Sequence, residues 1–109
     1  MGLDDWLAEQ FRARNWRRIR LAHREAPAVL IPGPDAHENV ARWLETHPSH
    51  RAVRGWLMHL DAFRGHSVVD TGVEWLDVTP RVGRYDLRFL WWHGTDVAYW
   101  RLAQEVARC

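Results

Sequence analysis

Residues 65–79 read GHSVVDTGVEWLDVT, and the expected sheet is built around these residues. It holds two mainly apolar runs, 65–70 and 73–79, on either side of Thr71-Gly72. Short runs rich in Val and Trp predict β-strands, and a Gly between them predicts a turn. We therefore expect an antiparallel hairpin whose register decides which polar side chains meet.

One register closes the hairpin on a two-residue turn at Thr71-Gly72. Asp70 then faces Val73, and His66 lies directly opposite Asp77 with the two Cβ atoms about 5 Å apart. An imidazole beside a carboxylate is oriented, held in one tautomer and made more basic. This register therefore predicts a His–Asp pair on one face of the sheet.

A three-residue loop with a bulge at Gly72 is the other common way to close the hairpin. It slips the register by one residue and sends the two polar side chains to opposite faces. Thr71 is a poor residue for the φ > 0 position of a two-residue turn, so both registers stay open. We expect the first because it also brings Val68 and Trp75 together on one face.

Three other stretches predict helices. Residues 3–14 place apolar side chains four apart on one face. A second helix follows Asp35, which is a good N-cap with Glu38 three residues later, and it ends at Pro48. A third helix follows Gly94-Thr95-Asp96.

Residues 52–60 and 84–92 predict two further strands, the second with one wetter face. Together with 65–70 and 73–79 they give an antiparallel sheet of about four strands packed against the helices. The expected fold class is α+β. We expect one domain over residues 1–109, because a chain of this length is too short for two.

The charge and hydropathy of the chain indicate which classes of binding partner to expect. Fifteen basic and fourteen acidic residues leave a net charge of +1, which does not favour nucleic acid. Residues 12–24 carry six Arg, a pattern that also occurs in nucleic-acid-binding surfaces, but we expect these side chains to form a solvated face. No apolar run approaches the ~20 residues that span a bilayer, and Met1–Asp5 is unlike a secretory signal. We expect a cytoplasmic protein with neither a membrane nor a nucleic-acid partner.

The helix after Asp35 supplies one more position of interest. At a helix start, the macrodipole and the free N–H groups lower a thiol pKa and can bind an oxyanion. Ala36 is the first helical residue and shares the core-facing side with Val40 and Trp43. This helix start therefore has the setting that a thiol nucleophile needs, but it carries Ala.

A nucleophile on a helix start, then His on a strand and Asp on the next strand, resembles the order in transglutaminase-like and papain-like cysteine enzymes. Over roughly residues 34–96, short motifs are also similar to those of a group of small bacterial proteins whose first motif opens with Cys, C-x-x-N-V. The motifs here are A-H-E-N-V (36–40), G-W (55–56), H-S-V-V (66–69), D-V-T-P (77–80) and F-L-W-W-H-G-T (89–95).

The resemblance implies a papain/transglutaminase-like core with Ala36 at the nucleophile position, His66 as general base and Asp77 as its orienting partner. The expected function is thiol-dependent acyl transfer on a peptide or protein, of the peptidase, amidase, deamidase or transglutaminase type, without a cofactor. With Ala36 the chain is expected to be inactive, either through an engineered Cys-to-Ala change or as a natural pseudoenzyme. The candidate substrate-binding residues are Asn39, Trp56 and Trp75.

Other interpretations of these residues stay open. His66 is also typical of a structural histidine, Asp77 of a turn cap and Asn39 of an exposed helix face, which would leave a non-catalytic peptide- or protein-binding module. A metal site would need His59 opposite His66, but a row of three ligands ending at Asp77 spans ~10 Å, so we expect no metal. Cys109, the last residue, lacks the surrounding donors that a thiolate requires.

Overall fold

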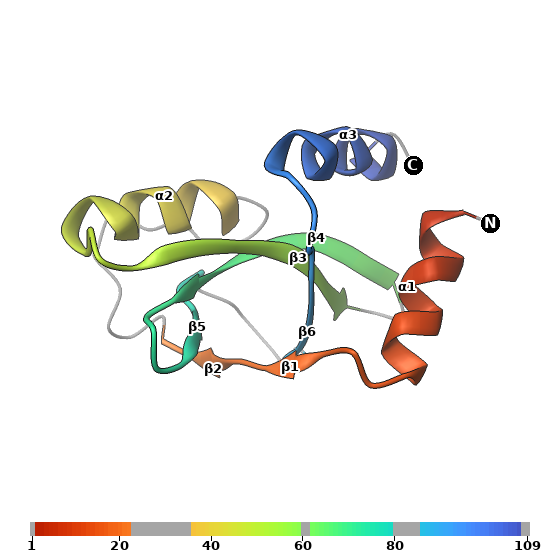
Figure 1. Cartoon of the computed structure of the whole chain (residues 1–109), viewed down its shortest axis with the longest axis horizontal. Coiled ribbons are helices and arrows are strands. Elements are labelled where there is room, and N and C mark those ends of the chain that lie inside the picture. The colour runs from red at the N-terminus through yellow and green to blue at the C-terminus, as the bar shows by residue number, and fades with distance from the viewer. Residues whose placement is uncertain (1, 23–35, 60–61, 80–85, 108–109) are drawn as a thin grey trace.

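The structure is a computed structural model that describes residues 2–22, 36–59, 62–79 and 86–107. Its elements are α1 (Leu3–Arg12), β1 (Arg17–Arg18), β2 (Arg20–Leu21), α2 (Ala36–Thr46), β3 (Arg51–His59), β4 (Ala62–Asp70), β5 (Trp75–Asp77), β6 (Arg88–Trp91) and α3 (Asp96–Ala107). Figure 1 shows α2 and α3 on one side of β3 and β4, with β1 and β2 on the other side. No helix of the described part of the chain is long and apolar enough to cross a membrane.

The strands form one mixed sheet that nearly closes into a barrel. Its order is β1-β6-β3-β4-β5-β2, a six-stranded sheet. The two outermost strands belong to one stretch, Arg17–Leu21, in which β1 pairs antiparallel with β6 and β2 pairs parallel with β5. Between them, Ile19 donates its N–H to the carbonyl oxygen of Leu87 at 3.0 Å. The prediction of an antiparallel sheet of about four strands is therefore wrong, although α+β holds in broad terms.

The two extra strands were missed for a physical reason. Each is two residues long, and both are exposed and rich in Arg, so neither shows the alternation that marks a strand. Their partners lie far along the chain, with Arg17 facing Phe89 and Arg20 facing Leu76. Only the assembled sheet makes these pairings.

The turn between β4 and β5 also differs from the prediction. Asp70 pairs with Trp75, so the predicted two-residue turn with Asp70 opposite Val73 is wrong. In the longer turn the hydroxyl oxygen of Thr71 accepts the N–H of Val73 at 3.2 Å, and Gly72 adopts φ 93°. The register shifts by two residues, and because strand side chains alternate with period two, every side chain keeps its face.

Side chains on the two faces of the sheet form separate parts of the core. The inner face, which the barrel encloses, carries Ile19, Leu57, Val68 and Phe89. The outer face packs on the helices, with Val69, Leu76 and Val78 meeting Val40 and Trp43 of α2, and Trp56 and Leu90 meeting Leu7 of α1 and Tyr99 of α3. The predicted inner stripe of α2 is confirmed, because Ala36, Val40 and Trp43 are buried. Asp35 and Cys109 lie outside the described residues.

Candidate functional site

His66 and Asp77 meet on the inner face of the sheet. Nε2 of His66, in β4, lies 3.0 Å from Oδ1 of Asp77, the last residue of β5. Because Val69 faces Leu76, the same register brings Asp77 beside Val68, and the imidazole reaches it diagonally from the next position on that face. His66 is 7% exposed and Asp77 0%, so this is a buried pair.

A short series of hydrogen bonds ties the pair to helix α2. Oδ1 of Asp77 also accepts the backbone N–H of Thr79 at 3.2 Å. The hydroxyl oxygen of Thr79 in turn accepts a bond of 3.4 Å from the side-chain amide of Asn39. Asn39 is 0% exposed, so it is not on an exposed helix face, and its amide supports the site from within the core.

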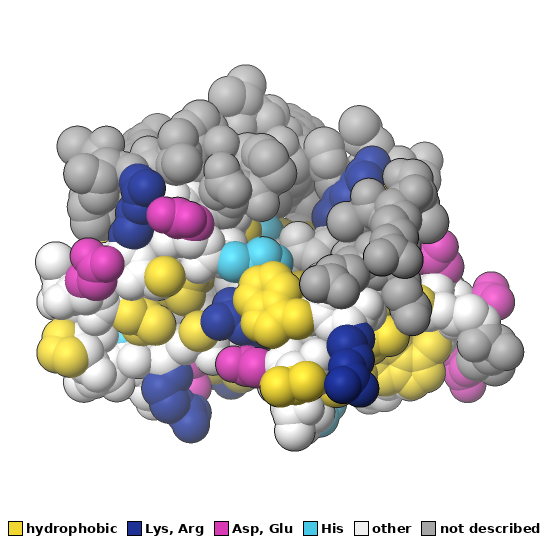
Figure 2. Space-filling model, turned by 90° about the horizontal axis from the view of Figure 1, so that it is seen from above, with side chains coloured by type: hydrophobic (Ala, Val, Ile, Leu, Met, Phe, Trp, Pro, Cys, Tyr) yellow, Lys and Arg dark blue, Asp and Glu magenta, His cyan; other side chains and the backbone are white. Residues whose placement is uncertain are grey.

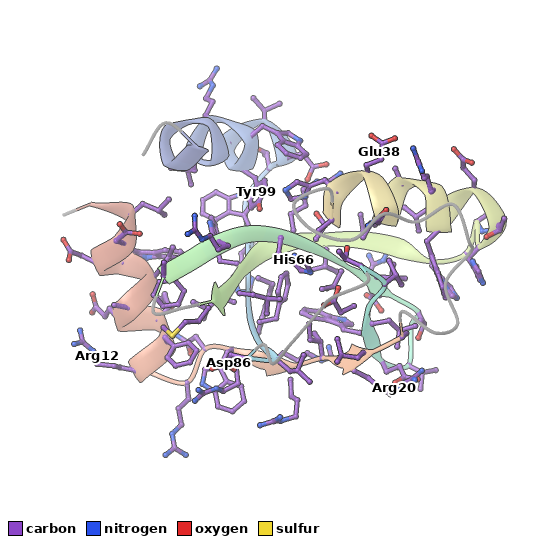
Figure 3. All side chains as sticks on the ribbon, turned by 180° about the vertical axis from the view of Figure 1, so that it is seen from behind. Arg12, Arg20, Glu38, His66, Asp86 and Tyr99 are labelled. Carbon is purple, nitrogen blue, oxygen red and sulfur yellow. The ribbon has the colours of Figure 1, made fainter. Side chains whose placement is uncertain are left out.

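Ala36 begins α2 and is itself buried. Asn39 follows three residues later, so the two side chains share one flank of the helix. Ser67 of β4 contacts His37 at the start of α2, whereas Figure 3 shows His66 on the opposite side of β4 from α2 and α3. The flank of α2 that carries position 36 is thus linked to the imidazole–carboxylate pair through Asn39 and Thr79.

A second polar cluster lies on the outer face, between the starts of α2 and α3. Nδ1 of His37 contacts Oγ of Ser67, and Nη1 of Arg54 donates to the same oxygen at 2.9 Å. The Arg54 guanidinium also lies 4.9 Å from the ring centre of Trp100 and 3.7 Å from the carboxylate of Asp96. Figure 2 looks onto this face and shows histidine at the surface beside a large hydrophobic side chain.

The charge state of His37 follows from this setting. Burial, followed by the positive charges of Arg54 and His66, lowers its pKa from 6.5 to about 4. The ring is therefore neutral at pH 7 and can accept the hydroxyl proton of Ser67. Ser67 is 0% exposed, so the contact holds α2 on the sheet. The sequence held no sign of it, because it joins residues on a helix and a distant strand.

Tyr99 of α3 fixes the strand that carries His66. Its hydroxyl accepts the backbone N–H of His66 at 3.2 Å and donates to the carbonyl oxygen of Gly55 at 2.7 Å. The hydroxyl thus sits between two facing residues of β3 and β4. Burial raises the pKa of Tyr99 to about 12, so the hydroxyl keeps its proton and can donate it. Sequence reasoning missed this residue, because a tyrosine within a predicted helix gives no sign of a bond to distant strands.

The two candidate tryptophans lie in different surroundings. Trp56 is 1% exposed and packs in the outer core with Leu7 and Tyr99, so it offers no surface to a substrate. Trp75 is only partly buried, and the guanidinium of Arg17 lies 4.3 Å from its ring centre. Trp75 also lines a surface groove.

The register needed for a row of metal ligands does not form. His66 faces Gly55, whereas His59 pairs with Ala62 at the end of the hairpin. Among the described residues there is no group of three or more His, Cys, Asp or Glu side chains that could hold a metal ion.

No protein-family model, no curated protein and no solved structure matches this chain. The resemblance to cysteine enzymes therefore rests on the motifs alone, and the function has to be argued from the site.

Proposed function

We propose that this domain has the scaffold of a thiol-dependent acyl-transfer enzyme, and that the chain is inactive because position 36 is Ala. The observation that carries the proposal is the buried His66–Asp77 pair, linked through Thr79 to Asn39, one helical turn from position 36. The substrate would be a peptide or a protein, acted on by peptidase, amidase, deamidase or transglutaminase chemistry.

The pair would supply the proton transfers. The carboxylate of Asp77 would orient the imidazole of His66 and stabilise its charged form. This step requires the ring of His66 to turn towards α2. A thiol at position 36 would then give its proton to the imidazole and form a bond from sulfur to the substrate's carbonyl carbon. The C–N bond would then break as the imidazole returns the proton to the leaving amine. Water or a second amine would cleave the resulting thioester, and that choice separates hydrolysis from transfer.

A second candidate is a non-catalytic peptide- or protein-binding module. Two observations favour it: the side chain of His66 points to the inner face, away from α2, and the first residue of α2 has no nucleophile. The pair would then be structural and would hold β5 on β4. A thiol introduced at position 36 distinguishes the two candidate functions experimentally.

The test is Ala36→Cys in a Cys109→Ser background. Ala41→Cys, at an exposed position of the same helix, is the matched control. If the scaffold is that of a thiol enzyme, the thiol pKa at position 36 should fall to ~3.5–7.5, against ~8.5 at position 41. The pH dependence of iodoacetamide alkylation, checked by the ultraviolet absorbance of the thiolate, gives both values. Adding His66→Ala should return the pKa at position 36 towards that of an ordinary thiol.

The opposite result is equally clear. A thiol at position 36 that titrates like the one at position 41, or that ignores His66→Ala, would leave the binding module as the better account of this domain.

A further inference from the structure

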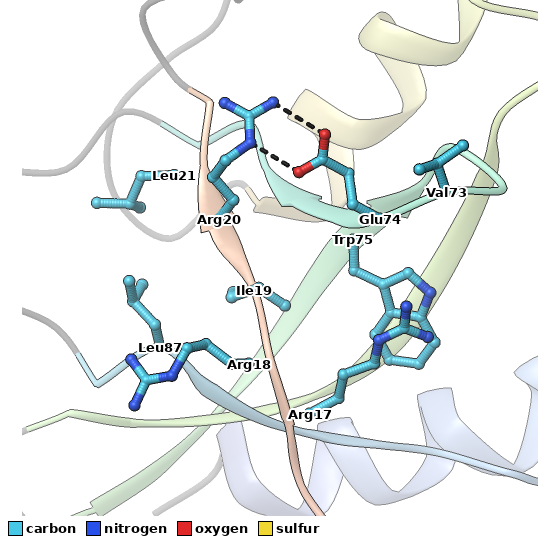
Figure 4. A pocket seen from close by; sticks show the side chains of 9 residues that line it. All are labelled: Arg17, Arg18, Ile19, Arg20, Leu21, Val73, Glu74, Trp75 and Leu87. Atoms are coloured by element: carbon cyan, nitrogen blue, oxygen red, sulfur yellow. Dashed lines mark hydrogen bonds and ion pairs between the residues drawn. The ribbon is translucent and has the colours of Figure 1, made fainter.

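An open groove of about 600 Å³ lies where the stretch Arg17–Leu21 runs beside the turn between β4 and β5 (Figure 4). Arg17, Arg18 and Arg20 line it together with Val73 and Trp75. The groove therefore borders the stretch that closes the sheet, and it combines positive charge with apolar surface.

The groove keeps an excess of positive charge. Arg20 is matched by Glu74, whose carboxylate accepts a bond of 2.7 Å from its Nε. Among the residues that the structure describes, neither Arg17 nor Arg18 forms an ion pair, and Arg17 instead lies over the ring of Trp75 at 4.3 Å. A guanidinium on an aromatic face keeps its N–H groups directed outward, so Arg17 can receive a carboxylate. Arg18 is exposed and can receive one as well, although Asp70 and Asp86 lie near enough for the charges of Arg17 and Arg18 to act on them.

Apolar side chains are exposed along the same groove. Val73 is 87% exposed and Leu21 is 39% exposed. Large apolar side chains on a surface lose contact with water when a partner covers them, and this contributes about 25 cal/mol for each Å². The groove can thus take carboxylates and apolar side chains together.

We infer that the groove binds an acidic peptide segment in an extended conformation, with carboxylates on Arg17 and Arg18 and apolar side chains against Val73 and Leu21. Single-stranded nucleic acid fits less well. Its bases need open aromatic faces, but Arg17 covers Trp75, and the whole chain has a net charge of only +1. The inference does not depend on the proposed acyl-transfer function.

Binding can be measured by fluorescence anisotropy with a fluorescein-labelled peptide of alternating Glu and Leu. The double variant Arg17→Gln/Arg18→Gln should weaken binding at least about tenfold, because two charge-assisted contacts are lost. Val73→Ser should weaken it about threefold, because apolar contact is lost. Added salt should weaken the wild-type complex, since the contacts are exposed to solvent.

Matched controls come from exposed residues outside the groove. Arg12→Gln/Arg101→Gln removes the same charge, and Val97→Ser removes an equivalent side chain that is 65% exposed. Both should bind within about twofold of wild type, as expected for surface changes away from a contact. Four results would overturn the inference: no binding of the Glu–Leu peptide, equal binding of a Lys–Leu peptide, equal losses in the controls, or preferential binding of oligothymidylate.

Discussion

At the residue scale, His37 shows how neighbours set the charge of a side chain. Its ring lies 4.6 Å from that of Trp100 and contacts the hydroxyl of Ser67, which also receives a bond from Arg54. Burial disfavours the charged ring, and a second positive charge beside this guanidinium is also unfavourable, so the pKa falls to about 4. The neutral ring can therefore hold α2 against β4 at pH 7.

This lowered pKa predicts a loss of stability in acid. Since the ordinary value is 6.5 and the folded value about 4, the unfolded chain binds more protons between these pH values. The free energy of unfolding therefore falls as the pH drops through that window, and it does not fall on this account above pH 6.5. In His37→Gln this decrease in the free energy of unfolding should be smaller by about 1 kcal/mol. The value is discounted for solvent screening, because the ring is only half-buried.

Urea unfolding across that pH range measures the effect. His93→Gln, which changes an exposed histidine, should keep the wild-type profile. If His37→Gln also keeps it, groups other than His37 cause the loss of stability in acid.

At the element scale, Gly55 lets three strands meet. It pairs with His66 of β4 and with Trp91 of β6. A Cβ at this position would lie 2.0 Å from the backbone oxygen of Leu90, closer than any real contact. The close approach of β6 to β3, and with it the placement of the strand that faces His66, therefore requires a residue without a side chain.

Gly55→Ala should consequently destabilise the fold by about 3 kcal/mol or more, because the backbone of β6 has to move. Gly65→Ala is the matched control on the facing strand. Its Cβ would approach only the hydroxyl of Tyr99, at 3.2 Å, so a smaller cost of about 1 kcal/mol is expected. Urea unfolding of both variants measures the loss in free energy of unfolding. Equal losses in the two variants would show that β6 is free to shift.

At the scale of the whole molecule, one short stretch closes the sheet. Residues 17–21 reach from β6 to β5, and the side chain of Ile19 enters the inner core with Leu57, Val68 and Phe89. The buried His66–Asp77 pair lies inside the sheet that this stretch closes. Loss of the closure should therefore loosen strands that are far apart in the sequence.

Ile19→Ala tests this dependence. The side chain is 3% exposed, so its truncation should cost about 3 kcal/mol. It should also speed hydrogen exchange of the Ala22 amide, which bonds to the carbonyl oxygen of Asp77 at 2.9 Å. Leu21→Ala, at a position that is 39% exposed, should have little effect on either measurement. Exchange at Ala22 that is unaffected by Ile19→Ala would mean that β2 stays paired without the inner-core anchor.

Local patterns were enough to predict several features of this protein. Periodicity and capping residues near in sequence predict the buried stripe on α2, the start of α3 and the strands β4 and β5. The pattern also put His66 and Asp77 on one face. The shared face is confirmed although the predicted turn is wrong, because a register shift of two residues leaves every side chain of a strand on the same face of the sheet.

The closure of the sheet and the surroundings of the candidate site depend on contacts between residues that are far apart in the sequence. Two-residue strands carry no periodicity, and the pairing of Arg17 with Phe89 exists only once both ends of the chain have folded. The neutral state of His37 on α2 depends in the same way on its burial and on Arg54, which β3 supplies. Whether a side chain on α2 can reach an imidazole on β4 depends on which face of β4 the helix covers, and packing of the whole core sets that face.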